Sequence, residues 1–121
     1  MLSWPGSVRI FVATDTLDMR CGFDRLAYHV QAILNQDPLS GHLFVFFNRV
    51  RDRCKILFWD QTGYCLWYKR LEAGTFETID PADGSRCRML DRAGLTLLLE
   101  GIDLRAVRQR KRYHRPAEVP G

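Results

Sequence analysis

The carboxylates that follow predicted strands are the groups in this sequence best placed to do chemistry. Asp15, Asp18 and Asp24 follow one predicted strand, and Asp60 follows a later one. Acidic side chains at strand ends can hold Mg²⁺ for phosphoryl chemistry. Each also has a structural interpretation, because Asp18 and Asp24 can cap or charge-stabilise a helix N-terminus and Asp60 is a turn former. We favour the structural interpretation and keep a Mg²⁺-dependent nuclease as the weaker alternative.

Other catalytic scaffolds are missing from the sequence. It contains no G-x-x-x-x-G-K-[ST], G-x-G-x-x-G, G-x-S-x-G or H-E-x-x-H motif. The three histidines are scattered, at His29, His42 and His114. The four cysteines form no C-x-x-C pair and have no histidine at metal-ligand spacing: Cys21, Cys54, Cys65 and Cys87. The sequence therefore predicts a non-enzymatic protein without cofactor or metal.

The segment KILFWDQTGYCLWYKR, residues 55–70, predicts a hairpin with two different faces. Its turn pairs Trp59 with Tyr64, and side chains alternate between faces along both strands. One face is predicted to join the core and holds Cys54, Ile56, Phe58, Cys65 and Trp67, with Lys69 at its end. The other face is amphipathic and holds Arg53, Lys55, Leu57, Trp59, Tyr64, Leu66, Tyr68 and Arg70.

The amphipathic face has two interpretations. Aromatic rings beside cations are what single-stranded nucleic-acid platforms use, with rings that stack on bases and cations that contact phosphates. Alternatively, Leu57, Trp59 and Tyr64 pack under a helix or a partner chain, and the cations form a solvated fringe. A register shift of one residue would exchange the two faces.

The C-terminal segment RAVRQRKRYHRP is the second basic feature. Residues 105–121 carry six cations and one anion, and residues 49–70 carry six cations and two anions, in a chain of net charge +4. The cations predicted to bind nucleic acid or a partner here are Arg105, Arg108, Arg110, Lys111, Arg112 and Arg115. If the segment is helical as far as His114, four of its arginines line one side. The alternative is a solubilising tail.

The elements that must position these residues follow from hydrophobic periodicity. Strands are predicted at 8–14, 42–49, 54–59 and 64–71, and a loop at 72–88. A helix is predicted from an apolar stripe of Phe23, Leu26, Ala27, Val30, Ile33 and Leu34. A second helix is predicted to begin at the N-cap Asp91 and stop near Gly101, with Leu95, Leu98, Leu99 and Ile102 on one face.

This order, β-α-β-β-β-α, predicts a small α+β domain with a mainly antiparallel sheet and helices packed on it. We expect one domain over 1–104 and a basic tail over 105–121. The 121 residues are 46% hydrophobic and 26% charged, which is typical of one globular domain with its own core. No apolar run approaches the roughly 18 residues that a membrane span needs, and no secretory signal is recognisable. We therefore expect a cytoplasmic protein with no membrane partner.

Three stretches carry a family resemblance. They are VRIFVATDTLDMRCGFDRLA (8–27), QDPLSGHLFVFFNRVRDRCKILFWDQTGYCLWYKRLEAGTF (36–76) and LTLLLEGIDL (95–104). Together they resemble the small TnpB-type accessory proteins of bacterial insertion sequences, which are unrelated to the RNA-guided nuclease of the same name. The strings D-M-R, D-P-x-S-G-x-L-F-V-F, W-D-x-x-G and K-R-L-E-x-G-x-F are specific in combination. Cys21 departs from the polar or basic residue expected at its position.

The resemblance implies an accessory factor in DNA transposition that acts beside a DDE-type transposase. The family supplies no catalytic residues to transfer to this chain. The implied partners are DNA, the transposase and the other accessory protein of the element. Our leading hypothesis is DNA binding through the amphipathic hairpin face and the tail. The second is a protein-interaction module whose aromatic rings dock on a partner, with the cations as its polar rim.

Overall fold

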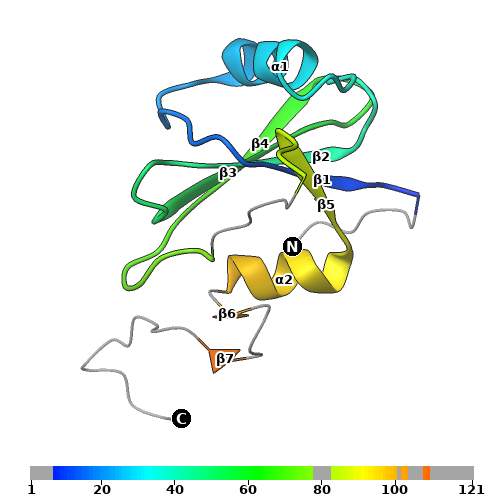
Figure 1. Ribbon diagram of the computed structural model, residues 1–121. Helices are drawn as coiled ribbons and strands as arrows, with labels where there is room; N and C mark the ends of the chain where they lie inside the picture. The colour runs from blue at the N-terminus through cyan, green and yellow to red at the C-terminus, as the bar shows by residue number, and fades with distance from the viewer. Residues whose placement is uncertain (1–6, 78–82, 101, 104–107, 110–121) are drawn as a thin grey trace, which may run out of the picture.

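The computed structural model describes residues 7–77, 83–100, 102–103 and 108–109 (Figure 1). Five strands form one sheet in the order β4-β3-β2-β1-β5. In chain order the elements of this domain are β1 (Ile10–Ala13), α1 (Phe23–Ala32), β2 (Leu43–Phe47), β3 (Arg53–Trp59), β4 (Tyr64–Arg70), β5 (Cys87–Leu90) and α2 (Arg92–Leu99). Two short strands, β6 (Ile102–Asp103) and β7 (Arg108–Gln109), pair with each other.

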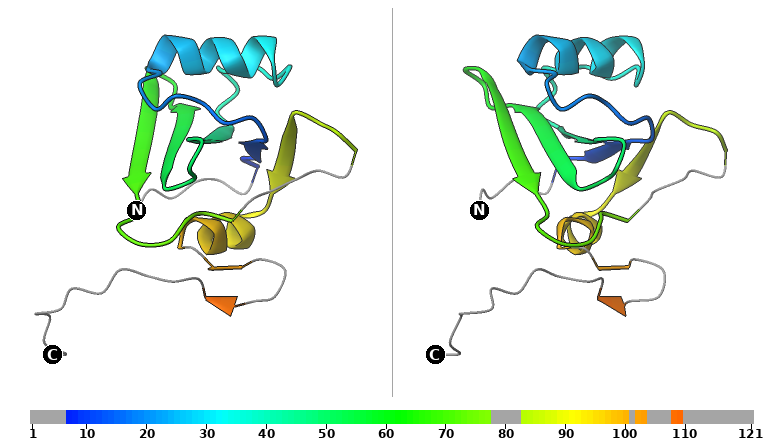
Figure 2. Two further views of the ribbon diagram at one scale, coloured as in Figure 1. Left: turned by 60° about the vertical axis from the view of Figure 1, so that its left-hand side comes forward. Right: turned by 90° about the vertical axis from the view of Figure 1, so that its left-hand side faces the viewer.

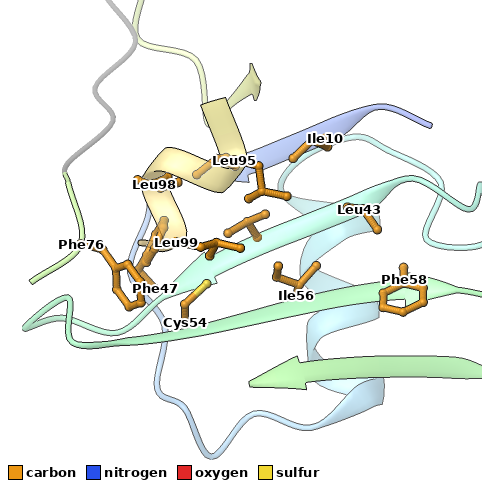
Figure 3. Packing of buried hydrophobic residues seen from close by; sticks show 12 residues of the cluster. Ile10, Leu43, Phe47, Cys54, Ile56, Phe58, Phe76, Leu95, Leu98 and Leu99 are labelled. Carbon is orange, nitrogen blue, oxygen red and sulfur yellow. The ribbon is translucent and has the colours of Figure 1, made fainter. Parts of the chain in front are cut away.

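The sheet lies between two helices, as the two views of Figure 2 show. All five residues of β2 are buried, because successive side chains point into opposite layers and both layers are apolar. Phe44 and Phe46 pack toward α1, whereas Leu43, Val45 and Phe47 pack toward α2. Figure 3 shows the α2 side of the core. The result is a three-layer arrangement in which each helix covers one sheet face.

The strand pairing confirms the predicted fold class. β1 runs parallel to β2, with α1 in the connection between them, while the other pairs in the sheet are antiparallel. The parallel pair is consistent with its connection, since parallel neighbours need a long crossover. β4 and β5 are the two edge strands, so β4 has one side without a strand partner.

The hairpin register is confirmed in full, from Trp59 opposite Tyr64 to Arg53 opposite Arg70. Asp60 forms the turn as predicted, because its Oδ1 accepts hydrogen bonds from the backbone N–H groups of Thr62 and Gly63. Gln61 has a positive φ of 88°. The positive φ in this turn is therefore taken by Gln61 and not by the glycine Gly63.

The apolar stripe of the first helix is confirmed except at its start. Leu26, Val30 and Leu34 are buried, although the regular helix ends at Ala32. Phe23 was placed on the core face but is 46% exposed. The first buried residue of α1 is Leu26, about one turn later. Phe23, the first residue of the helix, therefore lies outside the contact between α1 and the sheet. In the part of the chain that the structure describes, no helix is long and apolar enough to cross a bilayer.

The second helix begins as predicted but ends earlier. Asp91 is its N-cap, with Oδ1 accepting from the Gly94 backbone N–H at 2.7 Å. Leu95, Leu98 and Leu99 are buried, as expected from their spacing. Ile102 was placed on the same helical face, but it lies in β6. The predicted stop, Gly101, lies outside the described residues.

Three strands in the described part of the chain were missed: β5, β6 and β7. β5 lies at the end of the segment predicted as a loop; its four residues pair with all of β1 although they show no apolar alternation. In the basic tail, the helical interpretation is wrong at Arg108, which belongs to β7. The other tail cations predicted for binding lie outside the described residues: Arg105, Arg110, Lys111, Arg112 and Arg115.

Candidate functional site

The aromatic end of the amphipathic hairpin face lies against the layer that contains α1. Leu57 is buried, and Tyr64 and Leu66 are partly buried in a cluster with Leu26 and Val30 of the helix. The rings of Trp59 and Tyr64 meet edge to face at 5.2 Å between centroids. The covering-helix interpretation is therefore confirmed for Leu57 and Tyr64, and this end of the face is used in packing.

Lys55 is also enclosed by the protein. It is only 8% exposed, and its Nζ donates to the backbone carbonyls of Met19 at 2.6 Å and Cys21 at 2.9 Å. The same ammonium lies 4.9 Å from the centroid of the Tyr68 ring. Lys55 therefore fastens the loop between β1 and α1 to the sheet, and its charge lies beneath Tyr68 instead of in solvent.

Arg53 and Tyr68 form the accessible part of this face. The Arg53 guanidinium donates to the Tyr68 hydroxyl at 3.2 Å, and this hydrogen bond raises the pKa of Arg53. Tyr68 is 49% exposed on the edge strand β4. Within the described residues Arg53 makes no ion pair. Its charge is therefore available to an incoming anion.

Two surface depressions meet at Arg53. One, of about 520 Å³, lies between residues 16–19 of the β1–α1 loop and residues 48–50 after β2. The other, of about 330 Å³, is lined by Arg53, Tyr68, Arg70 and Glu72. We call the two together the Arg53 groove. Its walls are the β1–α1 loop, which Lys55 holds, the turn between β2 and β3, and the end of β4.

The turn after β2 is held by Asn48. Its Oδ1 accepts from the backbone N–H groups of Asp52 and Arg53, and its Nδ2 donates to the Asp52 carboxylate at 2.7 Å. Arg49 is thereby placed, exposed, on the wall of the groove. Arg51 turns the other way, with its guanidinium 4.8 Å from the centroid of the Phe47 ring. The turn thus presents Arg49 outward and packs Arg51 inward.

The two carboxylates that line the groove are each paired with an arginine. Asp18 accepts from Arg20 at 2.8 Å, and hydrogen bonds from Arg20 lower the pKa of Asp18 to about 2. Glu72 accepts from Arg70 at 2.9 Å. Arg49, like Arg53, makes no ion pair in the described part of the chain. The groove is therefore left with an excess of positive charge.

The predicted strand-end carboxylates do not converge on one point. Asp15 pairs with Arg86 of the segment before β5, and Asp60 is engaged in its own turn. Asp24 lies in the first turn of α1, where its charge stabilises the helix N-terminus as predicted. The prediction of side-chain capping by an aspartate was wrong, because the N-cap is Gly22. No group of three or more His, Cys, Asp or Glu residues among those described is placed to hold a metal ion.

Reasoning from the sequence missed Asn48, Arg49 and Arg20 as parts of the site. The run NRVRDR, residues 48–53, looked like a polar break between strands. Its arginines recur at every second position, which in a strand would place them all on one side. The pattern therefore contains no signal that Arg49 lines the groove while Arg51 packs on Phe47. Arg20, whose side chain is 92% exposed, belongs to the D-M-R string, but nothing in that string predicts its pairing with Asp18 beside the groove.

The comparisons with known proteins match this chain over most of its length. The sequence model of one family, described as IS66 Orf2 like protein, matches residues 8–109. An uncharacterised protein of Sinorhizobium fredii, y4hO, is 42% identical over 105 residues, which cover 87% of this chain and 90% of the relative. A second from the same organism, y4jC, is 36% identical over 112 residues, 93% of each chain. No solved structure matches.

Proposed function

Because the chain belongs to the family of IS66 Orf2 like proteins, we propose that it is a non-catalytic accessory factor in the transposition of an insertion sequence. Its proposed action is to bind DNA through the Arg53 groove, with the transposase and the other accessory protein as partners on that DNA. Residues 105–115 would add cationic contacts at the C-terminal end.

One observation carries the proposal. Two depressions share Arg53, a guanidinium that donates a hydrogen bond to the Tyr68 hydroxyl and makes no ion pair with the described residues. An arginine without a carboxylate partner favours a phosphate, which it can bind through two parallel N–H groups. Arg49, which likewise makes no ion pair among the described residues, extends the positive lining to one side of Arg53, while Arg70 on the other side is paired with Glu72. Cations spaced along a groove suit a polyanion better than a single small ligand.

The protein-interaction alternative is less well supported by the same geometry. It required the rings of Trp59 and Tyr64 to dock on a partner, but Tyr64 packs in the layer under α1 and Trp59 packs against Tyr64. The surface that stays accessible is polar and cationic at Arg49, Arg53 and Arg70. The half-exposed ring on this face, Tyr68, is bordered by these cations, which suits a polyanion as well as a protein partner.

The test is a mobility shift at low salt with DNA from the ends of the element. The variant Arg49→Gln/Arg53→Gln should bind about tenfold or more weakly, since each contact to a charged phosphate contributes on the order of 1 kcal/mol. The matched control is Arg88→Gln/Arg92→Gln, which removes two exposed arginines at β5 and α2, beside the opposite edge of the sheet.

The control should bind within about twofold of wild type, because it changes the net charge equally but leaves the groove intact. If both double variants lose affinity to the same extent, the groove has no special role and only net charge matters. If the groove variant keeps its DNA affinity but no longer captures the transposase, the interaction module replaces DNA binding as the function.

A further inference from the structure

Tyr68 is held so that one face of its ring is open. Lys55 Nζ lies 4.9 Å from the ring centroid, and Lys55 is itself buried, so the ammonium occupies the face that points toward the protein. The hydroxyl is fixed by the guanidinium of Arg53. Tyr68 as a residue is nevertheless 49% exposed, so the ring face opposite Lys55 is the one open to solvent.

Both contacts also draw electron density out of the ring. A cation over one face is attracted to the π-electrons, and a hydrogen bond donated to the hydroxyl oxygen acts in the same direction. A ring polarised in this way favours stacking with an electron-rich partner on its free face. Nucleobases are flat, electron-rich partners of this kind, and they stack on aromatic side chains irrespective of sequence.

The cations around the ring suit the rest of a nucleotide. Arg53 of β3 and Arg70 of the edge strand β4 line the same depression of about 330 Å³ as Tyr68, and Arg70 is paired there with Glu72. This volume is at the lower end of the roughly 300–1,000 Å³ typical of ligand sites, so it suits one nucleotide. Because packing and hydrogen bonds already hold the ring, little ordering is needed on binding.

We propose that the Arg53 groove takes single-stranded DNA, with one unpaired base stacked on the open face of Tyr68 and a flanking phosphate on Arg53. This inference rests on the proposed DNA binding and adds the class of DNA. In a duplex the base faces are covered by their neighbours, so the ring can contribute only when a base is unpaired.

Fluorescence anisotropy at low salt tests the assignment. The three labelled probes are a 12-nucleotide DNA strand, the same strand in a blunt duplex, and an RNA strand of the same sequence. We expect the DNA strand to bind more tightly than the duplex. Tyr68→Leu should weaken strand binding within the range of about 5- to 150-fold that one stacked base contributes, and leave duplex binding unchanged.

Two further variants separate stacking from other roles. Tyr68→Phe keeps the ring and removes only the hydroxyl, so it should retain the strand preference. Tyr28→Leu changes a tyrosine that is 69% exposed on α1, and it should behave as wild type. Urea unfolding of each variant checks that the fold is kept, which is expected because both tyrosines are surface residues.

The outcomes separate this inference from the proposed function. Binding of strand and duplex with equal affinity, or an equal loss for both in Tyr68→Leu, would overturn the stacking assignment and leave DNA binding in place. Tighter binding of the RNA strand than the DNA strand would overturn the assignment to DNA. Absence of binding to every probe would overturn both proposals.

Discussion

Lys55 belongs to β3, and its ammonium joins β4 to the loop that precedes α1. It lies against the Tyr68 ring of β4 and hydrogen-bonds to two carbonyls of that loop. Its stem crosses the sheet face while Nζ donates to the carbonyls of Met19 and Cys21. Long cationic side chains can bury their carbon stem in this way and keep the charged end hydrogen-bonded. In this protein the acceptors are backbone carbonyls, so Lys55 is a structural residue that supports one wall of the Arg53 groove.

Replacing Lys55 tests that structural role. Lys55→Met keeps the length of the stem but leaves two carbonyls without their donor, and we expect it to lower the free energy of unfolding by about 1–3 kcal/mol. Urea denaturation followed by fluorescence measures the change. Arg88→Met, at an exposed position on β5, should change stability by only about 0.5 kcal/mol or less.

A Lys55→Met protein as stable as wild type would contradict the role given to this ammonium. The sequence could predict the strand position of Lys55 and its neighbour Tyr68, because alternation in a hairpin is strictly periodic. It could not predict burial, since the two acceptors lie more than 30 residues earlier in the chain and meet Lys55 only after α1 has packed.

At the scale of elements, the segment after β4 is attached to the β2–β3 turn. The Leu71 N–H donates to the Asp52 carbonyl and the Phe76 N–H to the Arg51 carbonyl, both at 2.7 Å. Phe76 is 1% exposed, and its ring lies 5.3 Å from the Phe47 ring between centroids. Figure 3 shows the two rings side by side. This segment therefore helps to hold the turn that carries Arg49.

Two phenylalanines distinguish the elements that support the core from those that do not. Phe76→Ala should lower the free energy of unfolding by about 3–5 kcal/mol, because it empties a fully buried site. Phe23→Ala should cost about 1 kcal/mol or less, since that ring is 46% exposed. Chemical denaturation of both variants gives the comparison, and equal losses would contradict the described packing.

The helices and strands also show which of them could be predicted from local sequence patterns. Long periodic stretches, such as the α1 stripe and the hairpin, were predictable because burial repeats with the period of the element. β5 was not, since an edge strand exposed at Arg88 and Met89 has no apolar alternation to reveal it. Its pairing with β1 is a tertiary contact that overrides the turn chemistry of the preceding loop.

At the scale of the whole molecule, two histidines couple stability to pH. Burial lowers the pKa of His29 and of His42 below the ordinary value of 6.5. Asp15 opposes the shift at His29, while Arg86 at His29 and Arg9 at His42 act with burial. As pH falls through 6.5 the unfolded chain takes up protons before the folded chain does. Stability is therefore full above that pH and decreases below it.

The expected result is a lower urea midpoint at pH 5.5 than at pH 7.5 in wild type. The double variant His29→Gln/His42→Gln should show a smaller decrease, because neither position can then be protonated. Measuring both proteins at both pH values in one buffer system gives the comparison. A decrease of the same size in the double variant would show that other groups cause the pH dependence.

The Arg53 groove is formed by segments that are far apart in the sequence. Residues 16–19, residues 48–50 and the end of β4 meet at Arg53 only because α1 covers one face of the sheet and Lys55 holds the loop before it. Charge counting alone indicated a basic block at residues 49–70. It could not separate Arg53, which faces the groove, from Arg51, which packs on Phe47.

The most direct measurement of the central claim is the salt dependence of DNA affinity. For single-stranded DNA, log K falls with log salt concentration by about 0.7 per phosphate contact. The account predicts that Arg49→Gln/Arg53→Gln reduces this slope by roughly 1.4 relative to wild type, as expected for two lost contacts. The Arg88→Gln/Arg92→Gln control should keep the wild-type slope. An unchanged slope in the groove variant would contradict DNA binding through the Arg53 groove.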